Sequence, residues 1–143
     1  MRAAFDTNVL VSAALFGNSV PGQALRHVLR QGRVLISDET VTELAEVLGR
    51  PKFDRYVTAE ERGAFLQALI HEAELIEITR RIRACRDPKD DKFLELIVSG
   101  SATHLISGDE DLLCLNPFEG VPVLTPATFM AHLSTDPTTQ TGS

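Results

Sequence analysis

Short apolar runs alternate with segments of helical pattern along nearly the whole chain, and this alternation constrains the fold more than any other feature. Each run is too short for a typical helix, and a helix signal follows it: a capping residue, an early proline or apolar residues at helical spacing. Five runs are predicted as strands: 2–5, 33–37, 74–78, 104–107 and 121–124. Strands separated by helices predict a parallel sheet covered on both faces. We therefore expect an α/β fold, a three-layer α/β/α sandwich around a five-stranded parallel sheet.

The segments between the runs carry recognisable helix starts and stops. Asn8 or Thr7 is expected to cap the first helix and Asp38 the third. Thr58 and Glu61 form a capping box before the fourth. The expected helices are about 9–16, 21–31, 38–48, 59–72, 89–99, 109–113 and 125–132. The Ser/Thr/Pro/Gly-rich stretch 134–143 is expected to be disordered, which leaves one domain over residues 1–133.

Four acidic residues lie at or near the ends of the first four predicted strands. Asp6 ends the first strand and Asp109 closes the fourth. Glu43 lies in the helix after the second, and Asp91 opens the helix after the third. Because the carboxyl ends of parallel strands share the edge where ligands bind, these side chains are expected to meet in one pocket. Carboxylates without a nearby cationic partner favour a hard metal ion, Mg²⁺ or Mn²⁺.

Each of these acids also has a simpler interpretation. Asp6 and Asp109 are good helix caps, and Glu43 is a helical residue of the kind that usually faces solvent. The stretch 87–91 offers three acids at a helix start, where the helix dipole favours negative charge. Helix capping explains one or two of those three. A metal-binding pocket, unlike helix capping, explains why an acid follows each of the first four predicted strands.

The charge of the chain is unevenly distributed. Its formal net charge is −6, yet all 14 Lys and Arg residues lie within residues 1–92. Six of them gather in one segment next to the acids: Arg80, Arg81, Arg83, Arg86, Lys89 and Lys92. Such a basic loop is suited to attract the phosphate backbone of RNA toward the acids. The competing interpretation is a solvated loop whose charges only maintain solubility.

Several other classes are disfavoured. No apolar run approaches the roughly 20 residues of a membrane span, and Met1-Arg2 leads into a strand without a signal-peptide core. Cys85 and Cys114 are isolated, as expected for reduced thiols in the cytoplasm. The four histidines lack the spacing of a zinc site. We therefore expect a cytoplasmic protein with no membrane association.

The motifs resemble those of the PIN-domain ribonucleases, over residues 2 to about 133. The similarity rests on the triplet Asp6-Thr7-Asn8 after the first strand and on Ser107-Gly108-Asp109 after the fourth, together with Glu43 and Asp91. Stretch 87–94 is typical of the stand-alone VapC-like toxins of bacterial toxin–antitoxin pairs. The resemblance implies a PIN-like fold and a Mg²⁺- or Mn²⁺-dependent endoribonuclease. It also implies a homodimer and a small antitoxin that occupies the active-site groove.

The resemblance also implies roles for individual residues. The expected metal-binding and catalytic residues are Asp6, Glu43, Asp91 and Asp109. Groups expected to order water or position these ligands are Thr7, Asn8 and Ser107. Asp87 and Asp90 compete with Asp91 for the third position, and Asp111 is an optional further ligand. Asp91 is preferred because the helix from Lys92 leads directly from it to the fourth strand.

Two other protein families are disfavoured because this chain lacks single residues that they require. Haloacid-dehalogenase-like phosphohydrolases need a second Asp where this chain has Asn8, and they need a late Lys. Receiver domains need a similar late Lys, and none follows Lys92. The remaining alternative is a non-catalytic PIN-like domain that binds RNA or protein.

Overall fold

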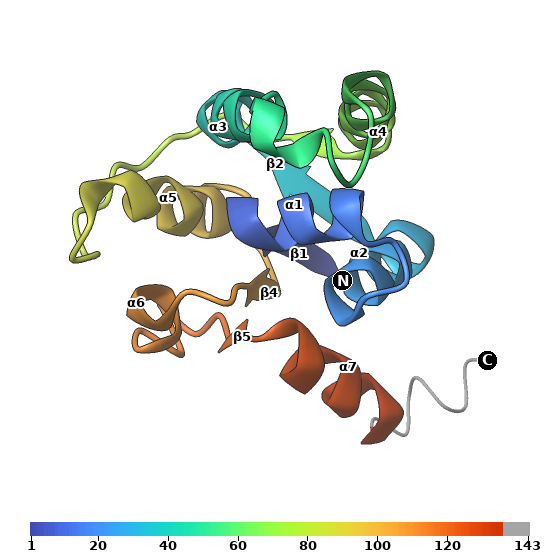
Figure 1. Ribbon diagram of the computed structural model, residues 1–143. Helices are drawn as coiled ribbons and strands as arrows, with labels where there is room; N and C mark the ends of the chain where they lie inside the picture. The colour runs from blue at the N-terminus through green and yellow to red at the C-terminus, as the bar shows by residue number, and fades with distance from the viewer. Residues whose placement is uncertain (136–143) are drawn as a thin grey trace.

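The protein is described by a computed structural model that covers residues 1–135 (Figure 1). One five-stranded sheet forms its centre. The strands are β1 (Arg2–Phe5), β2 (Arg33–Ile36), β3 (Glu74–Leu75), β4 (His104–Ile106) and β5 (Val123–Leu124). All neighbouring strands are parallel. The predicted fold class is confirmed.

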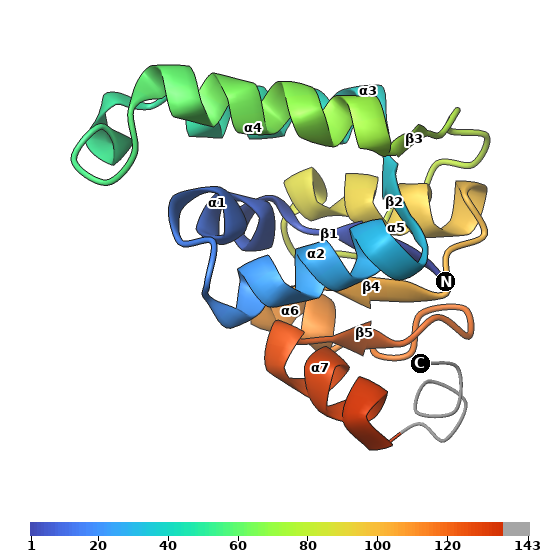
Figure 2. The same ribbon diagram turned by 90° about the vertical axis from the view of Figure 1, so that its right-hand side faces the viewer.

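Seven α-helices and two 3₁₀ turns connect the strands within residues 1–135. The α-helices are α1 (Thr7–Leu15), α2 (Val20–Gln31), α3 (Asp38–Leu48), α4 (Ala59–Glu72), α5 (Asp91–Ser99), α6 (Glu110–Leu113) and α7 (Pro126–Thr135). The 3₁₀ turns are η1 (Pro51–Phe53) and η2 (Pro88–Asp90). α3 and α4 form a long hairpin that projects to the far left of Figure 2, on the side where β1 runs into α1.

The strand order β3-β2-β1-β4-β5 locates the functional edge. From β1 the chain first builds outward through β2 and β3, and then returns to the other side of β1 with β4. The order therefore reverses between β1 and β4, the position where open parallel sheets bind ligands. Phe5 pairs with Ile106 in the register of these two strands, so Asp6 and Ser107 lie side by side at their carboxyl ends.

Alternate residues of each strand face opposite layers. Ala3 and Phe5 pack into the cluster under α1–α4 and α7, whereas Ala4 packs into the cluster under α5 and α6. Both faces of β1 are thus buried, as its continuous apolar run predicts. The core holds the sheet edge rigidly, and this edge positions the acids.

Several expected helix caps are wrong. Asp6, not Asn8 or Thr7, caps α1, and its Oδ1 accepts a hydrogen bond from Val9 N at 2.8 Å. Ser37 caps α3 in place of Asp38, because its hydroxyl and Thr40 form a reciprocal capping box. In both cases the residue directly after the buried strand takes the role, since the chain turns into the helix one residue earlier than expected.

Element lengths also differ from expectation. β3 comprises two residues instead of 74–78, because the chain leaves the sheet after Leu75 at the exposed edge. The helix expected from Lys89 is divided into η2 and α5. α7 continues to Thr135, two residues past the expected domain boundary at 133. The rest of the predicted tail, 136–143, lies outside the described residues. Within residues 1–135, no helix has the length and apolar character needed to cross a membrane.

Candidate active site

Asp6 is the central acid of the sheet edge. Only 4% of the residue is exposed, and both of its carboxylate oxygens accept hydrogen bonds. Oδ1 caps α1, and Oδ2 accepts from the Ser107 hydroxyl and from Gly108 N at 3.2 Å. Burial raises the pKa of Asp6, the hydrogen bonds oppose this rise, and the charge of Asp109 adds to it. Asp6 is therefore a fixed carboxylate that a nearby cation would stabilise in its charged form.

Ser107 couples Asp6 to the segment that carries Asp109. The Ser107 side chain is fully buried, donates to Asp6 and accepts from Asp109 N at 2.9 Å. Asp109 in turn caps α6, and its Oδ1 accepts from Asp111 N at 2.8 Å. The two acids predicted after β1 and β4 are thus brought together. Asp111 is half-buried beside them on α6.

The three acids around η2 separate into different environments. Asp91 is buried, and its Oδ1 accepts from Ala84 N at 3.0 Å and Cys85 N at 2.8 Å. Burial opposes ionisation of Asp91, but these two amide hydrogen bonds, together with the Cys85 side chain and the charge of Arg83, outweigh it and lower the pKa of Asp91. Asp91 therefore ties the basic loop to the start of α5. Asp87 is exposed and accepts from Lys89 N at 2.9 Å, which caps η2.

Asp90 is the member of this group that interacts with the other acids. Burial and the charges of Asp109, Asp87 and Glu43, with Lys92 opposing, together raise its pKa to about 6. Asp90 and Asp91 are consecutive residues near a helix start, so their side chains point in directions roughly 100° apart. The preference for Asp91 rested on its place in the sequence. The structure instead places Asp90 within the electrostatic reach of Asp109 and Glu43.

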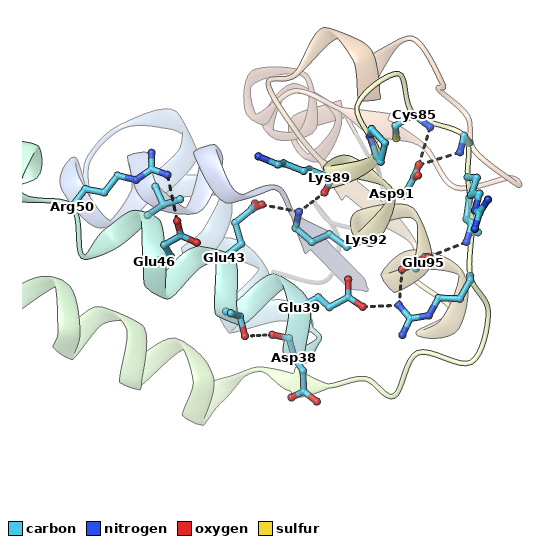
Figure 3. A pocket seen from close by; sticks show the side chains of 17 residues that line it. Asp38, Glu39, Glu43, Glu46, Arg50, Cys85, Lys89, Asp91, Lys92 and Glu95 are labelled. Carbon is cyan, nitrogen blue, oxygen red and sulfur yellow. Dashed lines mark hydrogen bonds and ion pairs between the residues drawn. The ribbon is translucent and has the colours of Figure 1, made fainter.

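Glu43 reaches the site from the middle of α3 and has a cationic partner. Its Oε2 lies 2.7 Å from Lys92 Nζ, and its Oε1 accepts from the Thr7 hydroxyl (Figure 3). The Lys92 side chain is only 10% exposed. The expectation of carboxylates without a cationic partner is thus not met at Glu43. The ion pair joins α3 to α5 across the groove that they form.

This groove has a volume of about 1200 Å³ and lies between α3, α5 and the start of the basic loop. Glu43, Lys92 and Asp91 line its middle, and Arg50 lines it toward the end of α3 (Figure 3). A smaller cavity of about 310 Å³ is lined by Asn8, Gly108 and Asp109 among others. Glu43 and Asp91 therefore line the groove, whereas Asp109 lines the smaller cavity.

The six basic residues of the loop divide into paired and unpaired groups. Arg80 binds Glu119 through two contacts of 2.6 and 2.7 Å, and Arg81 contacts Glu39 at 2.5 Å and Glu95 at 3.1 Å. Lys92 pairs with Glu43, as described above. The remaining three are exposed and form no ion pair within the described part of the chain: Arg83, Arg86 and Lys89.

The potential ligand atoms at this edge of the sheet are of the type that a hard divalent cation prefers. All are carboxylate or hydroxyl oxygens, and burial, with an added contribution from the charge of Asp109, raises the pKa of Asp6 and Asp90. Among residues 1–135, no three Asp, Glu, His or Cys side chains are grouped closely enough to hold an ion by themselves. Mg²⁺ commonly binds through one or two carboxylates and completes its shell with water and substrate phosphate. The arrangement suits that mode better than an all-protein cage.

The family follows from comparison with known proteins. A family profile described as PIN domain matches residues 2–111, so the chain belongs to the PIN-domain family. Members of this family are in general nucleases that use a divalent metal ion. An uncharacterized protein of Methanocaldococcus jannaschii, MJ1680, is 29% identical over 117 residues, which cover 80% of this chain and 75% of the relative.

Two solved structures share the fold. VapBC2 from Rickettsia felis, bound to a DNA fragment from its promoter, aligns with a TM-score of 0.60 and 14% identity over 86% of this chain and 97% of that one. PAE2754 from Pyrobaculum aerophilum aligns with a TM-score of 0.64 and 14% identity over 95% of this chain and 91% of that one. At such identities the likeness concerns the fold.

Proposed function

We propose that this protein is a metal-dependent endoribonuclease that hydrolyses RNA phosphodiester bonds. The observation that carries the proposal is the convergence of Asp6 and Asp90 on Asp109 at the point where the strand order reverses, since the charge of Asp109 contributes to the raised pKa of both. Carboxylates that are placed close together with raised pKa values are costly to the fold, and such groups cluster at functional sites. Membership of a nuclease family supports the same conclusion.

In this proposal Asp6, Asp109 and Asp90 hold Mg²⁺ or Mn²⁺, with Glu43 beside them. The bound ion would supply an activated water and stabilise charge on the phosphate. Ser107 and the amide of Gly108 fix the Asp6 carboxylate, so little reorganisation is needed when the ion binds. Thr7 and Lys92 hold Glu43 in the middle of the groove, where it can orient a water molecule. Asp91 maintains the basic loop.

The test is cleavage of a labelled RNA in Mn²⁺ or Mg²⁺ by the wild type and matched Asp→Asn variants. We expect Asp6→Asn, Asp90→Asn and Asp109→Asn to lose at least about 100-fold in rate while remaining folded. Asp91→Asn should lower the melting temperature as well, because Asp91 anchors the loop through two backbone amides. Equal cleavage by wild type and the Asp6 variant would identify a contaminant and reject the assignment.

The alternative is a PIN-like module that binds RNA or protein without cleaving it. The Lys92–Glu43 ion pair is the observation that favours this alternative, because a lysine already neutralises one of the acids. RNA binding in Mn²⁺ with no cleavage, by a protein shown to bind the ion, would support it.

We further propose that the protein is the toxin of a bacterial toxin–antitoxin pair, inhibited by a small antitoxin in the groove between α3 and α5. Its fold is similar to that in the VapBC2 structure, which supports an antitoxin partner. A homodimer and a cytoplasmic location belong to the same proposal. A neighbouring open reading frame for a small protein that co-purifies with this chain and blocks cleavage would support it, and sedimentation would give the oligomeric state.

A further inference from the structure

The connection between α3 and α4, residues 49–57, exposes aromatic and basic side chains together; we name it the α3–α4 tip. Tyr56 is 52% exposed and meets Phe16, which is 48% exposed at the end of α1. The two rings lie edge to face, with centroids 5.5 Å apart and planes inclined by 72°. Because both side chains are about half exposed, this edge-to-face pair presents aromatic surface to solvent, on which a flat partner can pack.

Two cations of the tip lie over aromatic rings. The Arg55 guanidinium lies 5.3 Å from the centre of the Tyr56 ring, and Lys52 Nζ lies 5.2 Å from the centre of the Phe53 ring. The one acid of the tip, Asp54, is 2.8 Å from the buried Arg62, so its charge is already neutralised. Arg55 and Lys52 form no ion pair within residues 1–135. The tip is therefore locally positive on a chain of net charge −6.

The tip is continuous with the groove of the candidate active site. The groove runs from Arg81 past Glu43 and Lys92 to Arg50, the residue directly before η1. Among the residues that the structure describes, the Arg50 side chain forms one ion pair, with the exposed Glu46 at 4.0 Å, and such a surface pair is weak. Arg50 begins the α3–α4 tip, so a polyanion that follows the groove to Arg50 arrives at the segment that carries Arg55 and Tyr56. This segment lies at the far left of Figure 2.

We propose that the α3–α4 tip is a stacking platform for single-stranded RNA, on which Tyr56 and Phe16 receive a base and Arg50, Lys52 and Arg55 contact the flanking phosphates. The inference rests on the proposed function in that RNA is the ligand. Aromatic side chains interleaved with cations bind single strands in this way with little sequence preference, because every base has a stacking face. Charge complementarity and continuity with the groove favour a nucleic acid over a second protein surface here.

The chain offers a direct probe of this contact. Tyr56 is its single tyrosine, and the chain has no tryptophan, so tyrosine fluorescence reports on Tyr56 alone. Full-length Asp6→Asn protein in EDTA is titrated with an unstructured RNA 12-mer or with inorganic polyphosphate, and N-acetyltyrosinamide corrects for absorption by the RNA. Stacking predicts saturable quenching by the RNA and none by polyphosphate. Saturable RNA binding, followed by anisotropy, without quenching would overturn the proposal.

Variants in the same background give a second measurement. Tyr56→Ala should weaken RNA binding by about 5-fold to 150-fold, whereas Tyr56→Phe should bind like its parent. Arg55→Gln should weaken binding to both RNA and polyphosphate. Circular dichroism verifies folding, and Phe16→Ala provides an independent site if Tyr56→Ala is unstable. Unchanged RNA affinity in Tyr56→Ala and Phe16→Ala, or an altered sedimentation coefficient with unchanged affinity, would reject the platform and indicate a protein–protein surface.

The same samples separate this inference from the proposed function. If the wild type fails to cleave RNA in Mn²⁺ but Tyr56→Ala lowers RNA affinity, the nuclease assignment fails and the platform stands. If the wild type cleaves and Tyr56→Ala binds normally, only the platform fails. Failure of the Asp6→Asn protein to bind RNA at all would reject the platform as well.

Discussion

The repulsion around Asp90 makes a testable contribution to stability at the scale of a single residue. Burial and the charges of Asp109, Asp87 and Glu43 raise its pKa from 3.8 to about 6 in the folded chain. A carboxyl group with a raised folded pKa binds its proton more tightly in the folded state, so it stabilises the fold at low pH. This contribution is present below pH 3.8 and is lost as the pH rises through about 6.

We therefore expect Asp90→Asn to raise the melting temperature in EDTA at pH 7.5, because the variant removes a repelled charge. The difference from wild type should shrink as the pH falls from 7 toward 4. Thermal scans at a series of pH values test this, with the exposed Glu77→Gln as a control that should show no such trend. A wild type that equals or exceeds the Asp90 variant at pH 7.5 would contradict the coupling of the acids.

Lys92 is the second residue whose environment leads to a prediction. Its ammonium is 2.7 Å from Glu43, and its charge also acts on Asp90, so it would repel a metal ion held by these acids. Lys92→Met removes a repelling cation, so we expect Mn²⁺ to bind about tenfold more tightly, the equivalent of ~1.4 kcal/mol. Calorimetric titration with Mn²⁺ at pH 7.5 measures this. Lys52→Met, on the distant α3–α4 tip, is the matched control. If the Lys92 variant binds Mn²⁺ with unchanged affinity, Lys92 does not repel the bound ion and the prediction is wrong.

At the scale of elements, Arg62 joins α3, the tip and α4. It is 2% exposed, yet its guanidinium donates to Leu48 O at 2.6 Å, to Val57 O and to Asp54. The side chain thus satisfies the last turn of α3 and fixes the connection that follows it. This buried Arg in the first turn of α4 has a structural role, because its described contacts are to two backbone carbonyls and one carboxylate of the same chain.

Arg62→Met should lower the free energy of unfolding by about 2–4 kcal/mol, since two backbone carbonyls lose a buried partner. Urea denaturation gives the value. Arg55→Met, on the exposed surface of the same tip, should change it by less than about 0.5 kcal/mol. If both substitutions change the free energy of unfolding equally, the buried contacts of Arg62 do not stabilise the tip.

At the scale of the whole molecule, folding redistributes the charges of the basic loop. Arg80 and Arg81 are paired with carboxylates from other elements, whereas Arg83 and Arg86 remain exposed. In the Asp6→Asn background, Arg83→Ala with Arg86→Ala should reduce the slope of log affinity against log salt for single-stranded RNA by about 1.4. Arg80→Ala with Arg81→Ala should change the slope little, because those groups already contact acids. Fluorescence anisotropy at several salt concentrations measures both slopes. Equal slope changes in the two double variants would contradict the division of the loop into paired and unpaired arginines.

The sequence by itself determined the α/β/α layers and the edge of the sheet at which the acids lie. Apolar runs such as 2–5 and 33–36 fold as buried parallel strands because their composition leaves no polar face, and helix signals between them are local. An acid directly after β1 and another after β4 had to share one edge of the sheet. For that reason Asp6 and Asp109 were predicted as neighbours from spacing alone.

Only the tertiary structure decided what each charge meets. Asp6 both caps α1 and faces Asp109, Asp91 is taken up by backbone amides, and Asp90 is left in the field of the other acids. Lys92 was expected to contact RNA, but it pairs with Glu43 across the groove. Strand and helix signals are read from neighbours in sequence, whereas electrostatic energy depends on distances between residues far apart in the chain, and these exist only after the layers have packed.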